Sequence, residues 1–270
     1  MTGYISLSYW DLALASVFLV LNGAISLALQ LGLERRLAVA AVRMGVQLVL
    51  AGLVLKTLFA LASPWLTGLV VAAMVLFAGS EVRARQENRL RGGWGYGIGT
   101  GALALSGTTV LAVALLVLVR PVPWWSPQYA LPLGGMILGN GMSGISLALD
   151  SLHRAIVREG RAIEAQLLLD ATKWQAARPV LRAALRAGFM PLINAMAAAG
   201  LVSLPGMMSG QILSGVAPGE AVKYQILVML LIGGGTGLGV LLATLGALAR
   251  LTDVRHRLRP ERLTRPGGGG

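Results

Sequence analysis

The sequence has 270 residues, of which 56% are hydrophobic and only 13% are charged, and its mean hydropathy is +0.72. Soluble domains carry about 25% charged residues, so this composition excludes an ordinary soluble domain, and its high apolar content excludes intrinsic disorder. The absence of cysteine excludes a disulfide scaffold, iron–sulfur clusters and cysteine-based zinc sites. The composition predicts an all-α, polytopic membrane protein.

Seven apolar runs predict about seven transmembrane helices. In chain order they cover residues 9–31, 37–60, 65–79, 94–119, 130–149, 187–204 and 221–251. A helix needs about 20 residues to cross the hydrocarbon core, so the third and sixth runs are short for this purpose. We expect the run of glycines at 267–270 to be a flexible tail outside a single membrane domain of residues 1–266.

The basic residues are clustered between and after the apolar runs. They give a net charge of +12, and all but four of them lie in residues 35–36, 83–91, 154–186 and 250–265. A nucleic-acid surface would instead combine basic and aromatic residues on one soluble domain, so we expect no nucleic-acid partner. Alternating connections place all four clusters on one side of the membrane. The positive-inside rule then predicts an outside N-terminus, a cytoplasmic C-terminus and contacts with lipids of the inner (plasma) membrane.

Several motifs indicate what the chain does not do. Residues 139–144 spell G-x-G-x-x-G, but this pattern lies inside an apolar run without the strand that a dinucleotide site requires. No phosphate-binding G-x-x-x-x-G-K-[ST] motif occurs, so the chain does not itself hold ATP. The two histidines lie in basic clusters and form no nucleophile–His–acid set, so we predict no catalytic residues and no enzymatic activity.

Glycines that repeat every four residues predict close packing between helices, because a missing side chain lets a second helix approach. They form the sets Gly93, Gly97 and Gly101, Gly233 and Gly237, and Gly235 and Gly239. The partner helix belongs either to this chain or to a second copy of it.

Arg43 lies about two turns inside the second apolar run, and Gln47 follows on the same helix face. A charge at this depth costs on the order of 2–3 kcal/mol, so Arg43 must face protein or water. It lines a transport pathway or caps carbonyl groups of a neighbouring helix. No carboxylate lies at mid-membrane depth, which argues against a proton-coupled transporter.

The longest polar segment, residues 150–186, has a helical pattern. Leu152, Ile156, Ile163, Leu167 and Leu168 form an apolar stripe, and Pro179 interrupts the pattern. Such a helix lies on the membrane surface or docks into a groove of a soluble partner.

Within this segment, Glu164 to Asp170 (EAQLLLD) resembles the E-A-A-x-x-x-G coupling loop of ABC-transporter permeases, with Gln166 replacing the second alanine and Asp170 replacing the glycine. Other segments add to this likeness: GMILGN at 135–140, LPGMMSGQIL at 204–213, NGAISL at 22–27, and Arg43 with Gln47. Over about residues 12–250, the chain is similar to the family of the bacterial iron-export permease FetB, which includes plant aluminium-sensitivity membrane proteins.

This resemblance implies a permease domain that pairs with a separate ABC ATP-binding subunit and with a second copy of itself as a homodimer. ATP and magnesium would be bound by the partner subunit, so we expect no cofactor on this chain. The resemblance also implies that Glu164, Ala165 and Asp170 couple the membrane helices to the ATPase. Metal export, with iron as the substrate, rests on the resemblance alone.

The candidates for a transport pathway are thioether and amide side chains, which could contact a weakly held metal or metal chelate. They are Met136, Asn140, Asn194, Met207, Met208 and Gln211, together with Arg43 and Gln47. No metal site is assigned. An autonomous secondary transporter, a permease for an organic solute and a membrane scaffold remain alternatives.

Overall fold

The structure, a computed structural model, describes residues 8–253 and 257–264. The chain consists of two compact units, Met1–Ala62 and Ser63–Gly270. The expected single domain over residues 1–266 stays a prediction, and the glycine tail at 267–270 lies outside the described residues.

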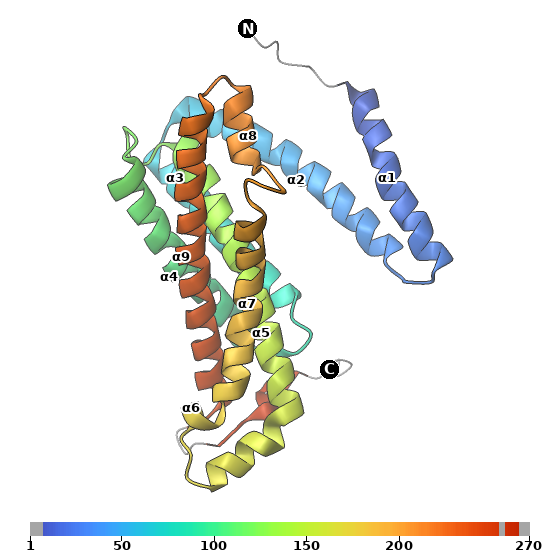
Figure 1. Ribbon diagram of the computed structural model, residues 1–270, viewed down its shortest axis with the longest axis vertical. Coiled ribbons are helices and arrows are strands. Elements are labelled where there is room, and N and C mark those ends of the chain that lie inside the picture. Colours follow the sequence, from blue (N-terminus) through green and yellow to red (C-terminus); the bar gives the residue numbers. More distant parts are fainter. Residues whose placement is uncertain (1–7, 254–256, 265–270) are drawn as a thin grey trace. The chain divides into compact units, whose positions relative to one another are not determined.

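The first unit is a helical hairpin of α1 (Tyr9–Ala28) and α2 (Glu34–Leu61) (Figure 1). Ser8 and Asp11 form a capping box that begins α1, because each accepts a hydrogen bond from the backbone N–H of the other. At the turn, the Ser26 hydroxyl donates to Glu34 at 2.9 Å and accepts from the Leu33 N–H at 3.0 Å. These bonds connect the end of α1 to the start of α2.

The second unit is a bundle in which α5 packs against α3, α4, α7 and α9. Its elements are α3 (Pro64–Ala84), β1 (Arg89–Leu90), α4 (Trp94–Val113), the π-helical η1 (Ala114–Val119), α5 (Pro127–Leu168), α6 (Lys173–Ala176), α7 (Arg178–Ala198), α8 (Gly206–Leu213), α9 (Pro218–Leu251), the 3₁₀-helical η2 (Pro260–Arg262) and β2 (Leu263–Thr264).

Each of the seven apolar runs overlaps a helix, although the first extends three residues past α1 and the sixth extends six residues past α7. The predicted all-α, multi-pass membrane class is confirmed. Among the described residues, five helical segments are long and apolar enough to span a membrane: α1, α2, α3, α4 continued by η1, and α9. The other two runs overlap α5 and α7, which also contain most of the charged residues of the polar segment. The number seven and the orientation of the termini stay predictions.

The glycines of α9 bring it close to α5, as their four-residue spacing predicts. A Cβ atom on Gly235 would lie 2.8 Å from Ile137, and one on Gly239 would lie 2.9 Å from Ile145, both on α5. On α5 itself, a Cβ on Gly144 would lie 2.9 Å from the carbonyl oxygen of Gly188 on α7. The G-x-G-x-x-G pattern at 139–144 therefore lies within a helix and contributes to helix packing.

The glycines near the start of α4 differ from those of α9. An added Cβ on Gly93, Gly97 or Gly101 would meet nothing within 4 Å, so these glycines allow no close helix approach among the described residues. Their packing against a second copy stays a prediction.

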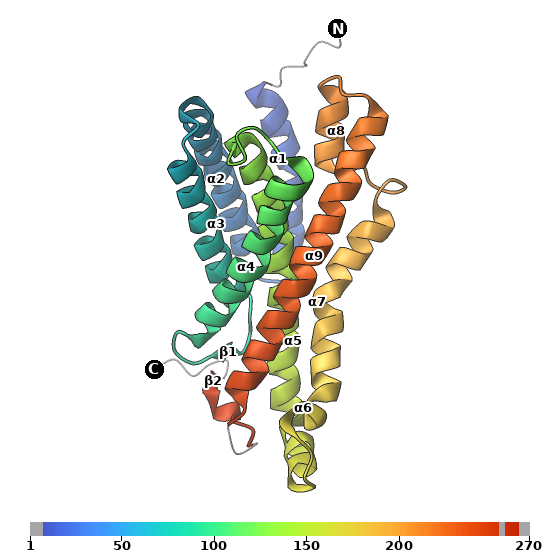
Figure 2. The same cartoon turned by 90° about the vertical axis from the view of Figure 1, so that its left-hand side faces the viewer.

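Three basic clusters meet at one end of the second unit. There β1 pairs with β2 in antiparallel register, with Arg89 opposite Thr264, and Arg250 lies 4.4 Å from the centre of the Trp94 ring. Figure 2 shows this small sheet and α6 toward one end of the bundle and α8 at the other. We call the first end the basic end. Its position on the cytoplasmic side stays a prediction.

Candidate coupling hairpin and membrane cavities

Helix α5 extends far beyond the apolar run that it contains. With 42 residues it is about 63 Å long, whereas the hydrocarbon core of a bilayer is about 30 Å thick. The polar residues 150–168 therefore continue the membrane helix without a break. At the basic end the chain turns through α6 and returns along α7 (Figure 1).

The turn after α5 has the geometry of a Schellman motif with Asp170 in the position where glycine is usual. The carbonyl oxygen of Gln166 accepts hydrogen bonds from the N–H groups of Leu169 and Ala171, both at 3.1 Å. Asp170 has φ +63°, in the left-handed region. Aspartate tolerates this conformation better than most residues with a side chain. The replacement of the motif glycine by Asp170 thus leaves the turn intact.

A small apolar core stabilises the hairpin. Ile163 of α5 is buried, as are Ala176, Ala177 and Val180 on the returning segment. Thr172 and Gln175 form a capping box that begins α6, and Pro179 lies in the first turn of α7, where proline is well tolerated. We call residues 164–175 the hairpin tip.

The hairpin tip brings together the three predicted coupling residues. Glu164, Ala165 and Asp170 are all exposed. Between them, Leu168 and Leu169 are 85% and 82% exposed. The tip therefore presents two adjacent apolar side chains beside two carboxylates.

The exposure of Leu168 corrects the predicted apolar stripe. Leu152, Ile156 and Ile163 are buried, and Leu167 is partly buried, as the stripe predicts. Leu168 is exposed because α5 ends there, beyond the part of α7 that could cover it. Helical spacing alone does not identify Leu168 and Leu169 as surface residues. The run of three leucines was a usable signal, because three consecutive residues cannot all lie on one helix face.

The base of the hairpin is joined to the loop between α3 and α4. Asp150 accepts a hydrogen bond from the Glu87 N–H at 2.9 Å and pairs with Arg154 at 2.6 Å. One turn along α5, the Nδ1 atom of His153 lies 2.9 Å from the carbonyl oxygen of Asn88. These contacts connect the hairpin to the loop that also carries β1.

His153 is fully buried at this junction, four residues beyond the end of the apolar run. Burial lowers the pKa of its imidazole below the ordinary value of 6.5, and the opposing effects of the Asn88 carbonyl and the Asp150 carboxylate are smaller. The ring is therefore neutral at neutral pH, and its role is to join α5 to the loop.

Two cavities border α8, and each is lined by one of its adjacent methionines. The cavity lined by Met207 has a volume of about 640 Å³ and also contains Met136 and Gln211 in its lining. The cavity lined by Met208 has a volume of about 440 Å³. The structure thus brings three predicted pathway residues together around the first cavity and places a fourth in the second.

The other predicted pathway residues lie outside these two linings. Asn140 is exposed on α5, where its side-chain amide donates to the Met136 carbonyl oxygen at 2.8 Å, and Asn194 is exposed on α7. Arg43 and Gln47 are exposed on α2 in the first unit. In the described part of the chain, no group of three or more histidine or carboxylate side chains could hold a metal ion.

In the cavity lined by Met208, sequence reasoning missed Met196, Gln225 and Met229 as pathway candidates. The spacing of Gln225 and Met229, four residues apart on one helix, was a usable signal. No pattern in the sequence points to Met196, because its place in the cavity lining depends on how α7 packs against α9.

The family model described as "Uncharacterised protein family (UPF0014)" matches residues 9–252, which is nearly the whole chain. The chain belongs to the UPF0014 family. A UPF0014 membrane protein from Synechocystis is 43% identical over 69% of this chain and 71% of its own length. The probable iron export permease protein FetB of Escherichia coli is 30% identical over 92% of this chain and 93% of its own length.

A plant relative, Protein ALUMINUM SENSITIVE 3 of Arabidopsis thaliana, is 31% identical over 83% of this chain and 80% of its own length. No solved structure matches the chain significantly. These findings confirm the resemblance to the family of the iron-export permease FetB and the plant aluminium-sensitivity proteins. The likeness of residues 164–170 to an ABC-permease coupling loop stays a prediction. They also agree with localisation as a multi-pass membrane protein.

Proposed function

We propose that this chain is the permease subunit of an ABC transporter that exports a metal, with iron as the first candidate, using ATP hydrolysed by a separate soluble subunit. The chain itself would catalyse no reaction, and two copies would pair with two ATP-binding subunits. Similarity to FetB over almost the full length of both chains supports the transport role and the choice of iron.

The hairpin tip is the observation that carries this proposal. A partner that closes on ATP needs a rigid lever to transmit its movement, and α5 is a continuous helix from the apolar run to the tip. Leu168 and Leu169 are exposed at the end of that lever. Apolar side chains on a helix end are suited to insertion into a groove on a soluble protein.

The proposal can be tested by co-purification of the chain with its ATPase from native membranes in mild detergent. The double variant Leu168→Asp/Leu169→Asp removes the apolar surface of the tip without touching the buried hairpin core. Burying a leucine contributes about 1.5–3 kcal/mol, so the loss of both should weaken ATPase binding by at least about 100-fold.

Two further variants are the controls. Val157→Asp places a single negative charge on an exposed apolar position of the same helix, about three turns before Leu168, and should leave ATPase binding unchanged. Asp170→Asn keeps a residue that tolerates φ +63° and tests the carboxylate alone. Full ATPase recovery with the double leucine variant would contradict the proposal, and the absence of any ATPase from the wild-type preparation would favour an autonomous transporter.

An organic solute is the second candidate substrate. Apolar side chains dominate both cavities, and the described residues that line them carry no charge. Organic ligands usually occupy such sites, with a few polar groups fixing their orientation. Stimulation of the co-purified ATPase by iron would support the metal, whereas stimulation only by organic compounds would support this alternative.

A further inference from the structure

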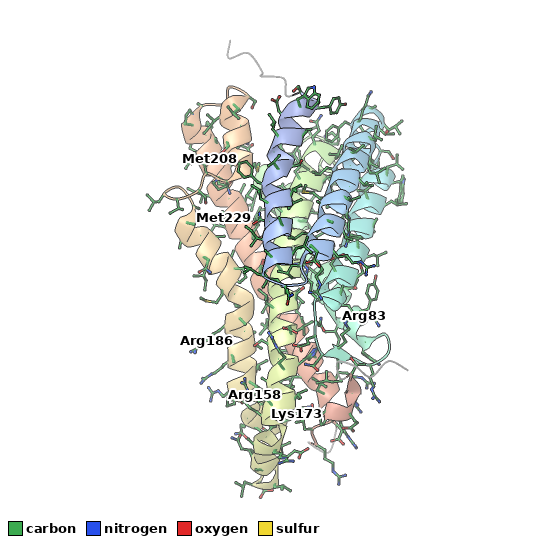
Figure 3. The ribbon with its side chains drawn as sticks, turned by 90° about the vertical axis from the view of Figure 1, so that its right-hand side faces the viewer. Arg83, Arg158, Lys173, Arg186, Met208 and Met229 are labelled. Carbon is green, nitrogen blue, oxygen red and sulfur yellow. The ribbon has the colours of Figure 1, made fainter. Side chains whose placement is uncertain are left out.

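The cavity lined by Met208 collects thioether groups from three helices. Met196 comes from α7, Met208 from α8 and Met229 from α9. Figure 3 shows Met208 and Met229 toward the opposite end of the bundle from Arg158 and Lys173. We call this space, of about 440 Å³, the methionine cavity.

One polar side chain in the methionine cavity lacks a partner. Gln225 lies one helical turn before Met229, and its side chain is only 8% exposed. Its Oε1 atom is buried and accepts no hydrogen bond from any described residue. A buried carbonyl oxygen without a partner is destabilising, so a ligand that it could coordinate would recover part of this free energy.

Methionine often fills irregular gaps in a core, but these three side chains border an open space that is large enough for an ion. Thioether sulfur is a soft donor that prefers soft metals such as Cu(I), whereas hard cations prefer carboxylates and water. The described residues that line the cavity include no acid. A monovalent cation is therefore favoured, because the cost of moving an ion out of water rises steeply with its charge.

We propose that the methionine cavity binds a soft monovalent cation of the Cu(I) or Ag(I) type through Met196, Met208 and Met229, with the Gln225 oxygen as a further ligand. The site requires no ATPase and no second copy of the chain, so it stands apart from the proposed function. If the chain is also a metal permease, the site lies at the end of the bundle opposite the hairpin tip.

The test uses the purified full-length chain in detergent, with Cu(I) kept reduced by ascorbate and held by the coloured chelator bicinchoninate. The chain contains no cysteine, so thiols cannot contribute to copper binding. We expect the wild-type chain to withdraw one Cu(I) per chain from the chelator. X-ray absorption of the bound copper should then show sulfur neighbours.

The decisive variant is Met196→Leu/Met208→Leu/Met229→Leu, because leucine has nearly the volume of methionine and preserves packing. Binding should weaken by more than about 100-fold, since even indirect partners of metal ligands contribute about 10–100-fold. Gln225→Leu should weaken it by about tenfold. Met190→Leu, on α7 but outside the lining of the methionine cavity, is the matched control and should bind as the wild type does.

Three outcomes would overturn the proposal: no withdrawal of Cu(I) by the wild-type chain, unchanged affinity in the triple variant, or a copper spectrum with only nitrogen and oxygen neighbours. The ATPase co-purification experiment is independent, because the triple variant keeps the hairpin tip. Failure of one proposal therefore leaves the other standing.

Discussion

Asp170 offers a direct test of why the coupling turn has its shape. Its φ of +63° places it in the left-handed region, at the position of the Schellman motif where glycine is preferred. A β-branched residue is strained there, and left-handed backbone costs an ordinary residue about 1–2 kcal/mol. We therefore expect Asp170→Val to open the turn, while Asp170→Gly should preserve it.

The Ala171 N–H reports on this turn, because it donates to the Gln166 carbonyl at 3.1 Å only while Asp170 keeps its left-handed conformation. A cost of about 1–2 kcal/mol raises the population of the open turn by about 5–30-fold. Hydrogen exchange of the Ala171 amide, measured in the membrane-embedded chain, should accelerate by this factor in Asp170→Val.

Two controls separate backbone conformation from charge. Asp170→Gly should show wild-type exchange or slower, and Asp170→Asn should resemble the wild type. Equal protection of Ala171 in the valine and glycine variants would refute the reasoning, because it would mean that the left-handed conformation carries no energetic weight in the turn.

The junction and the helix packing give three further predictions. His153 stays neutral in the native chain, whereas in the unfolded chain it takes up a proton near its ordinary pKa of 6.5. The free energy of unfolding should therefore fall below pH 6.5 by at most about 1.4 kcal/mol per pH unit. His153→Gln should reduce this pH dependence in thermal unfolding, and an unchanged pH dependence would contradict the prediction. Gly188→Val should reduce the free energy of unfolding by about 1–3 kcal/mol through overpacking, because an added Cβ would lie 2.9 Å from Ala148. The unfolding temperature should fall accordingly, whereas Gly93→Ala, whose added Cβ would meet nothing within 4 Å, should leave it unchanged. Asp150→Asn should speed trypsin cleavage between β1 and α4, because it weakens the contacts with Glu87 and Arg154; equal cleavage rates would show that the loop is held elsewhere.

Composition and hydropathy determined the class of this protein. The apolar runs predicted where its helices lie, because the cost of burying backbone polar groups in lipid allows little besides helices in such segments. The clusters of basic residues predicted that distant loops share one side, and β1 and β2 join two of them. Short motifs were sufficient to predict the family.

Tertiary structure decided how these helices continue and what they enclose. Hydropathy predicted that the fifth apolar run ends at residue 149, but α5 continues to Leu168 without a break. The helix continues because its backbone hydrogen bonds form in water as well as in lipid. Met207 and Met208 are neighbours in sequence but line separate cavities, because adjacent residues on a helix point about 100° apart. Which methionines from other helices join them depends on packing between α7, α8 and α9, which spacing along one helix does not encode.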